Sequence, residues 1–224
     1  MSNSGVRCWG SNSTGQLGDG TTTDRMKLST TDVLTGVKAI ATGSGHTCAL
    51  MDTGGVRCWG NNRFGQLGDG TTTNSSTPPT SDILTGVRAI VAGAAHTCAL
   101  MDTGGVRCWG DNFYGQLGDG TTTGTSTPPT GDVVTEVQAI AAGSNQTCIV
   151  TETGGARCWG SGASMMGSTL PTSDVLTGVR AIAAGHAHIC ALAGGVRCWG
   201  DNSVDQLGYP LHGMTPMNVV GFCE

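Results

Sequence analysis

The feature that most constrains this sequence is a repeat with a period of fifty residues. The run Gly-Val-Arg-Cys-Trp-Gly begins at Gly5, Gly55 and Gly105, with no gap between copies. A variant begins at Gly155 in the same register, and a last copy begins at Gly195, forty residues later. Self-similarity of this kind is the signature of a propeller, a solenoid or another array whose units pack mainly against their neighbours.

A second element recurs between copies of the first. It has the form Gly-Val-x-Ala-Ile-x-x-Gly-x-x-His-Thr-Cys-Ala-Leu at residues 36–50 and 86–100, with variants at 136–150 and 178–192. Small and apolar residues occupy both alternation faces of the Ala-Ile segment, which is typical of strands covered on both sides. Each His-Thr-Cys segment leads through a glycine turn into the next Cys-Trp-Gly run, a pattern that predicts a β-hairpin.

These elements predict an all-β chain. Each unit supplies about four short strands: the Cys-Trp-Gly strand, a Thr-Pro segment such as 77–84, the Ala-Ile strand and the His-Thr-Cys strand. Four antiparallel strands make one propeller blade, so we expect a β-propeller of about five four-stranded blades with an incomplete last repeat. We expect one repeat domain over 1–224, with units at 1–50, 51–100, 101–150 and 151–192 and a partial unit at 193–224.

The composition supports an array and narrows the possible partners. Thirty-eight glycines require many turns, whereas five Trp, three Phe and two Tyr are too few for one large aromatic core. The 11 Lys and Arg residues are dispersed and the net charge is -5, so we expect no nucleic-acid partner. Because no run of about eighteen apolar residues occurs, we expect no membrane insertion. The start, Met1-Ser-Asn-Ser, has no features of a secretory signal.

Three motifs that recur in order carry a family resemblance. Val-Arg-Cys-Trp-Gly, Gly15-Gln-Leu-Gly18 and the Ala-Ile to Cys-Ala-Leu element resemble the regulator of chromosome condensation repeat, in a cysteine-bearing form that looks bacterial. The resemblance covers essentially the whole chain and implies a propeller that usually closes seven blades. This chain departs from that number, with four complete units and a fifth that stops after two strands. The nucleotide-exchange and chromatin role of the founding eukaryotic member is a remote expectation, since its basic tail has no counterpart here.

The cysteines repeat with the units, and their spacing places them opposite one another. If Leu50 pairs with Val56, then Cys48 lies opposite Cys58, at a Cβ separation of about 4.5 to 5.5 Å that local twist can bring within disulfide reach. Free buried thiols are the alternative, and disulfides would imply an extracellular or cell-surface location. The candidate pairs are Cys48 and Cys58, Cys98 and Cys108, Cys148 and Cys158, and Cys190 and Cys198, while Cys8 and Cys223 remain near the termini.

The Gly-Asp-Gly-Thr-Thr-Thr loops at 18–23, 68–73 and 118–123 could be taken for calcium or phosphate sites. Each supplies only one carboxylate, and none precedes a helix with the lysine that a phosphate loop requires. We therefore interpret them as structural turns. No Cys-x-x-Cys pair indicates zinc, so we expect no metal and no cofactor.

The histidines and serines predict no catalytic residue. His46 and His96 share a repeat position with Gln146, which indicates a hydrogen-bonding strand residue rather than a base. His186 and His188 alternate on one strand face but lack a third metal ligand. No serine has a nucleophile-elbow pattern. We therefore expect that the protein is not an enzyme.

The loop after each Trp-Gly varies from unit to unit, and the symmetry of an array would bring these loops to one rim. Arg63 and Phe64 lie in the second loop, and Phe113 and Tyr114 in the third. Aromatic residues and arginine are enriched in protein interfaces. These four residues are therefore candidate interaction residues, with ordinary loop variation as the alternative.

The leading functional hypothesis is a structural or protein-interaction module that binds other copies of itself head to tail. Five Cys-Trp-Gly strands but only four hairpins leave an incomplete blade, and exposed edges pair readily with other chains. We expect oligomers or filaments joined through Cys8 and Cys223, reverting to monomers when residues 209–224 are deleted. A ring closed within one chain is the alternative. A second hypothesis is a secreted hydrolase inhibitor, similar to the β-lactamase inhibitor protein built on this propeller, with aromatic rim residues facing the enzyme.

Overall fold

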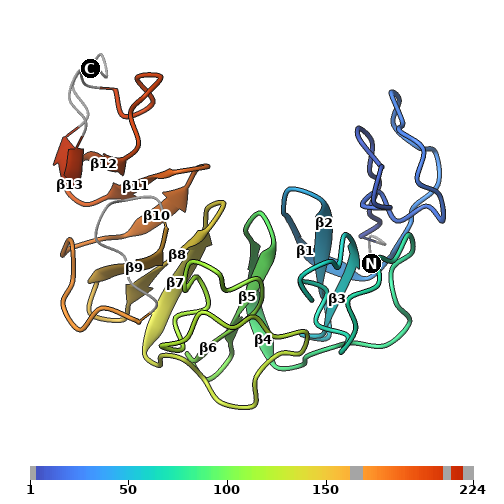
Figure 1. The fold of residues 1–224 in the computed structure, drawn as a ribbon, viewed down its shortest axis with the longest axis horizontal. Coiled ribbons are helices and arrows are strands. Elements are labelled where there is room, and N and C mark those ends of the chain that lie inside the picture. The colour runs from blue at the N-terminus through green and yellow to red at the C-terminus, as the bar shows by residue number, and fades with distance from the viewer. Residues whose placement is uncertain (1–3, 162–168, 209–212, 219–224) are drawn as a thin grey trace.

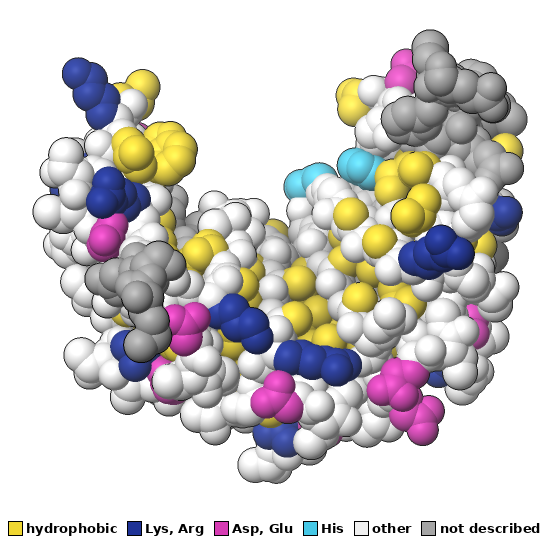
Figure 2. Space-filling model, turned by 180° about the vertical axis from the view of Figure 1, so that it is seen from behind, with side chains coloured by type: hydrophobic (Ala, Val, Ile, Leu, Met, Phe, Trp, Pro, Cys, Tyr) yellow, Lys and Arg dark blue, Asp and Glu magenta, His cyan; other side chains and the backbone are white. Residues whose placement is uncertain are grey.

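The chain forms an open arc of four antiparallel sheets (Figure 1). The structure is a computed structural model that describes residues 4–161, 169–208 and 213–218. Every regular element in these residues is a β-strand, which confirms the all-β prediction, and they contain no helix of the length and apolar character needed to cross a membrane. The same curved outline, with a hollow between two arms, appears from behind in Figure 2.

Each sheet follows the chain order of its strands. The first contains β1 (Val37–Thr42), β2 (His46–Met51) and β3 (Val56–Gly60), and the second contains β4 (Val87–Ala92), β5 (His96–Met101) and β6 (Val106–Gly110). The third contains β7 (Val137–Ala142), β8 (Gln146–Thr151) and β9 (Ala156–Gly160). The fourth contains β10 (Ala181–Ala184), β11 (His188–Leu192), β12 (Val196–Gly200) and β13 (Gly213–Asn218).

The second and third strands of each sheet form a tight hairpin. In the first sheet Leu50 lies opposite Val56 and Cys48 opposite Cys58, and the turn closes through a 2.8 Å hydrogen bond from Met51 N to Gly55 O. All six residues of β2 are buried, because both faces of this strand are covered. The equivalent hairpins repeat this register in the other three sheets.

The predicted fourth strand is shorter than the sequence indicates. In the first sheet the segment 75–84 meets β3 only through two isolated bridges, Val56 to Leu84 and Gly60 to Ser75. The two bridges lie nine residues apart on this segment but four apart on β3, so a continuous ladder cannot form, and the proline-free segment 25–34 shows the same spacing against Val6 and Gly10. An ion pair of 2.6 Å between Arg57 Nε and Asp82 Oδ1 also joins it to β3.

The sheets are offset from the sequence units. Each sheet takes its first two strands from one unit and its outer strands from the next, so the partial last unit supplies β12 and β13 and completes the fourth sheet. At the other end, residues 4–34 form only the outer part of a sheet, through bridges of Val6 with Leu34 and Gly10 with Arg25. We call this part the N-terminal half-sheet. In the described residues the half-sheet therefore lacks the first two strands of a sheet, whereas the fourth sheet has four strands although the last repeat is incomplete in sequence.

This placement bears on two further expectations. The half-sheet and the fourth sheet stand on opposite arms of the arc, so the described residues do not close a ring within one chain (Figure 1). Deleting residues 209–224 would remove β13 and uncover a second edge, which is a reason to expect aggregation rather than monomers. Cys223 lies outside the described residues.

Neighbouring sheets are joined through tryptophan. The indole N–H of Trp59 donates to the main-chain oxygen of Gln16 in the preceding unit, at 3.0 Å, and Thr47 Oγ1 donates to the same oxygen at 2.8 Å. The next two junctions repeat this pair of hydrogen bonds. Trp59 is fully buried, whereas Trp9, in the half-sheet, is 59% exposed.

Histidine adds a second link between sheets. His46 Nε2 lies 3.0 Å from Thr97 Oγ1 of the next sheet, and the hydroxyl proton of Thr97 is already donated to Gln66 O. Nε2 therefore carries the imidazole proton, and the buried Nδ1 has no hydrogen-bond partner. Burial lowers the pKa of His46 to about 4, and burial together with the charge on His46 lowers the pKa of His96 to about 3.

We expect Gly68→Ala to destabilise the protein more than Gly86→Ala. Both glycines have a left-handed φ, of 74° and 71°, so both substitutions share a backbone strain of roughly 1 to 2 kcal/mol. A Cβ at Gly68 would lie 2.7 Å from Trp109 Nε1, whereas one at Gly86 would meet nothing within 4 Å. Overpacking adds about 1 to 3 kcal/mol. Denaturant unfolding measures both variants, and equal losses would contradict the packing role.

We expect the double variant His46→Gln, His96→Gln to lose part of the acid sensitivity of the fold. The folded state holds both imidazoles neutral, so their contribution is complete above about pH 6.5 and is lost as the pH falls towards about 4, because the unfolded state takes up protons. Glutamine is accommodated at this position, as buried Gln146 shows. Unfolding midpoints between pH 7 and pH 4.5 test this, with exposed His186→Gln as the control. An unchanged pH profile in the double variant would refute it.

Candidate protein-interaction surface

The rim loops, defined as residues 11–16, 61–66, 111–116 and 201–206, share one scaffold. Buried Asn62 holds the second loop, since its Oδ1 accepts from Leu67 N at 2.9 Å and its Nδ2 donates to Asp69 Oδ1 at 3.1 Å. The Leu N–H contact recurs with Asn12, Asn112 and Asn202, all of them buried. Sequence reasoning overlooked these asparagines, although an Asn at the second position of four of the five loops was a visible signal.

The same hydrogen bonds give the Gly-Asp-Gly-Thr-Thr-Thr loops a structural role. Asp69 Oδ1 accepts from Asn62 Nδ2 and from both the amide and the hydroxyl of Thr71, at 2.9 and 2.8 Å. The Asp69 carboxylate therefore stabilises the turn through these hydrogen bonds. Within residues 4–161, 169–208 and 213–218, no three His, Cys, Asp or Glu side chains gather as a metal site would require.

The four candidate rim residues lie on these loops as two pairs. The Arg63 guanidinium lies 5.7 Å from the centroid of the Phe64 ring, and the rings of Phe113 and Tyr114 make an edge-to-face contact at 5.0 Å. The exposed fractions are 46% for Phe64, 71% for Phe113 and 46% for Tyr114. Each pair comes from one loop.

Hydrogen bonds hold the backbone under these aromatic side chains. Phe64 N donates to Gln66 Oε1 at 2.9 Å, and Gln66 Nε2 donates to Asn61 Oδ1 at 3.1 Å. In the next loop Gln116 binds Tyr114 N and Asp111 in the same way. A backbone that is already fixed reduces the conformational entropy that the loop loses when a partner covers it.

The rim loops lie beside the loops that join the first two strands of each sheet, here called axial loops (43–45, 93–95, 143–145 and 185–187). Asn61 N donates to Gly45 O at 2.8 Å, and Asp111 N donates to Ala95 O at 2.9 Å. Equivalent bonds run from Ser161 to Asn145 and from Asp201 to Ala187. Rim loops and axial loops therefore share one face of the arc.

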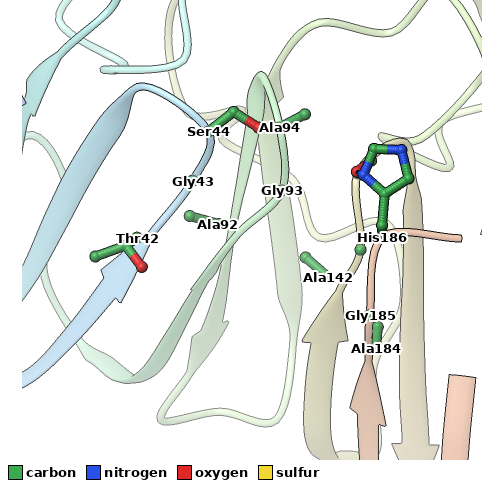
Figure 3. A pocket seen from close by; sticks show the side chains of 12 residues that line it. Thr42, Gly43, Ser44, Ala92, Gly93, Ala94, Ala142, Ala184, Gly185 and His186 are labelled. Atoms are coloured by element: carbon green, nitrogen blue, oxygen red, sulfur yellow. The ribbon is translucent and has the colours of Figure 1, made fainter. Parts of the chain in front are cut away.

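The axial loops surround a small hollow of about 210 Å³ (Figure 3). Glycine is needed at its wall, because a Cβ on Gly43 would lie 2.4 Å from the oxygen of Gly93 in the next sheet. Ser144 Oγ lies 2.6 Å from His186 Nδ1, but in the described residues no hydrogen bond joins a carboxylate to Nε2 of that ring. The pair thus lacks the orienting group of a hydrolytic triad.

The cysteines fall into two groups. The structure joins Cys48 to Cys58, Cys98 to Cys108, Cys148 to Cys158 and Cys190 to Cys198 as disulfides. Cys8 is a free, half-buried thiol on the half-sheet. Burial and then the charge of Asp19 raise the pKa of this thiol.

Three solved structures share the fold of this chain. Human WBSCR16 is 25% identical, with a TM-score of 0.84 over 97% of this chain and 63% of that chain. Yeast RCC1 (Prp20) bound to Kap60 is 22% identical, with a TM-score of 0.82 over 100% and 59%. Prp20p from Saccharomyces cerevisiae, described with its binding properties to Gsp1p and histones, is 24% identical, with a TM-score of 0.80 over 98% and 60%. The present chain thus spans about three fifths of the length of these proteins.

Family models match much of the sequence. The Regulator of chromosome condensation (RCC1) repeat matches residues 5–50, 53–100 and 103–150, and a second model of the same description matches 37–66, 87–116 and 137–164. No protein with curated annotation matches the chain in sequence. Since the repeat model covers more than half of the residues, in register with the sequence units, the chain belongs to the Regulator of chromosome condensation (RCC1) repeat family.

Proposed function

We propose that this chain is a non-catalytic protein-binding propeller segment whose rim loops contact a protein partner. Exposed aromatic side chains on hydrogen-bonded loops, next to the axial loops, carry the proposal. Such residues form the centres of protein interfaces when a partner excludes water from them. The family is typically non-catalytic, and yeast RCC1 (Prp20) was solved bound to the protein Kap60.

We further propose an extracellular or cell-surface setting for a single repeat domain spanning residues 1–224. Four hairpin disulfides are compatible with an oxidising compartment, where such bonds persist. Each disulfide closes a short loop, with partners eight or ten residues apart, so each adds local stability without tying distant units together.

The open half-sheet supports self-assembly as part of this function. Trp9 is 59% exposed there, and Met26 and Leu28 nearby are 90% and 54% exposed. Hydrophobic side chains gather on the corresponding arm in Figure 2. A surface of this kind on one end of an arc favours head-to-tail contacts, which close into rings or continue as filaments according to their rotation.

Hydrolase inhibition is the second candidate, favoured by the same aromatic rim. The two candidates differ in stoichiometry and in readout. Inhibition requires a one-to-one complex that abolishes the activity of a purified enzyme such as a serine β-lactamase, whereas a binding module leaves that enzyme unaffected.

We expect the triple variant Phe64→Ser, Phe113→Ser, Tyr114→Ser to fold normally and to lose its partner. The loops are held by main-chain and amide hydrogen bonds that the substitutions do not remove, so thermal stability should change little. Quantitative capture of proteins from the source organism's secreted fraction measures binding. Val175→Ser is the control, since Val175 is 42% exposed and lies outside the rim loops. Loss of secondary structure in the triple variant would show that these side chains pack internally instead.

We expect the purified protein to form concentration-dependent oligomers, part of them covalent through Cys8 and Cys223 under non-reducing conditions. Cys8→Ser should remove the covalent species and retain the non-covalent ones, because the exposed apolar surface of the half-sheet remains. Light scattering and non-reducing electrophoresis check both expectations. A monodisperse monomer at all concentrations would overturn self-assembly.

A further inference from the structure

The second and third rim loops, 61–66 and 111–116, share a backbone scaffold but differ in charge. In the second loop, Asn61 Oδ1 alone accepts from the amide two residues later, at 2.9 Å, and from the glutamine of the loop, at 3.1 Å. In the third loop Asp111 divides the same contacts, since Oδ1 accepts from the amide at 3.1 Å and Oδ2 from the glutamine at 3.0 Å. One neutral amide oxygen is therefore enough to hold this turn, and the loop does not require the negative charge of Asp111.

The two loops also differ in whether they supply a cation for their aromatic ring. In the second loop the Arg63 guanidinium lies 5.7 Å from the centroid of the Phe64 ring, which is a cation–π distance. The equivalent residues of the third loop are Phe113 and Tyr114. This loop thus keeps an aromatic ring at the position of Phe64 and replaces the cation by a second ring. Within the described part of the chain, no cation lies over either of these two rings.

The rings of Phe113 and Tyr114 are accessible to a partner. Their planes meet at 86°, so the edge of one ring contacts one face of the other and the remaining faces are free of ring contact. Both side chains are exposed. Because the face of an aromatic ring carries partial negative charge, it attracts a cationic group that approaches from outside.

The carboxylate of Asp111 belongs to the same site as the rings. Gln116 joins them, because its Oε1 accepts from Tyr114 N at 2.9 Å while its Nε2 donates to Asp111. Each oxygen of Asp111 accepts one of these loop hydrogen bonds and retains capacity for another. In the residues that the structure describes, no ion pair involves Asp111. A guanidinium suits this combination, since it donates to both oxygens of a carboxylate and stacks its flat face on aromatic rings.

The other described rim loops lack the combination of an acid and open rings. The second loop has a neutral amide and its own cation. The last loop keeps an acid at Asp201, but Ser203 and Val204 occupy the positions of the two rings. The first loop has neither, with Ser11 and Thr14 at the corresponding positions. The third loop is therefore the described one that is suited to a cation from another molecule.

We propose that the third rim loop binds an arginine side chain of the protein partner, with the guanidinium paired to Asp111 and stacked on the rings of Phe113 and Tyr114. This inference rests on the proposed function and deepens it by naming the chemistry that the partner presents. Five arginines of this chain are already held in ion pairs with aspartates. The arginine therefore comes from a different protein rather than from a second copy of this chain.

The test uses the peptide acetyl-Gly-Arg-Gly-amide as the probe, with citrulline in place of arginine as the control. Citrulline has nearly the shape of arginine but no charge. We expect the arginine peptide to shift the amide NMR resonances of residues 111–116 saturably, with an affinity at least about fivefold above that of the citrulline peptide. Equal affinities for the two peptides, or no saturable shift with the arginine peptide, would overturn the proposal.

The repeat supplies matched variants for this measurement. Asp111→Asn with Phe113→Arg gives the third loop the residues of the second at these positions, so the loop keeps its scaffold, brings its own cation and should lose the peptide. The reciprocal variant, Asn61→Asp with Arg63→Phe, should gain a second peptide site at residues 61–66. Asp201→Asn removes the same charge from a loop without rings and should leave binding unchanged. A first variant that still binds, a reciprocal variant that gains no site, or a control that loses binding would each contradict the proposal.

Peptide binding and partner capture separate this inference from the proposed function. Capture of a partner that depends on the three rim aromatics, combined with no binding of the arginine peptide, contradicts this inference alone. Selective binding of the arginine peptide, combined with partner capture that the triple serine variant retains, contradicts the proposed role of the rim and leaves the cation site of the third loop in place.

Discussion

The main-chain oxygen of one glutamine in each of the first three units, Gln16, Gln66 and Gln116, joins that unit to the next sheet. This oxygen accepts an indole N–H and a threonine hydroxyl from the next sheet, so one buried acceptor positions two side chains of its neighbour. A buried carbonyl with two satisfied lone pairs is costly to separate from its donors. Glycine at the end of the Gly-Gln-Leu-Gly motif leaves room for the indole ring. The stability of the whole is thus a sum of junctions between neighbours, as expected for a repeat protein.

Most of the fold could be predicted from the fifty-residue period, because equivalent residues of each unit adopt the same backbone geometry. Counting from Leu50 and Val56 is enough to bring Cys48 opposite Cys58, since a hairpin fixes register over its few residues. The irregular outer segments were harder to predict. A Thr-Pro run has the length of a strand, yet it meets β3 only through isolated bridges, because it is longer than the stretch of β3 that it faces.

The position of the open edge illustrates a limit of reading units one after another. A sequence unit and a sheet have different boundaries. Each sheet takes its first two strands from one unit and its outer strands from the next, so the boundaries differ by about half a unit. Only the pairing shows that Val6–Gly10 lacks an inner neighbour in the described residues. Part of the candidate rim surface could be named from the sequence, because Phe113 and Tyr114 stood out by residue type. Asn62 did not, because its role depends on a hydrogen-bonding network between two loops.

The offset between unit and sheet bears on how such a chain can change in length. Duplication of one unit anywhere within the array inserts a whole sheet, built from the second half of one copy and the first half of the next. The other sheets keep their structure, and a copy of one of the first three units brings its own glutamine carbonyl, tryptophan and threonine for the new junction. Arrays of different lengths can therefore arise from single recombination events without any new packing arrangement between sheets.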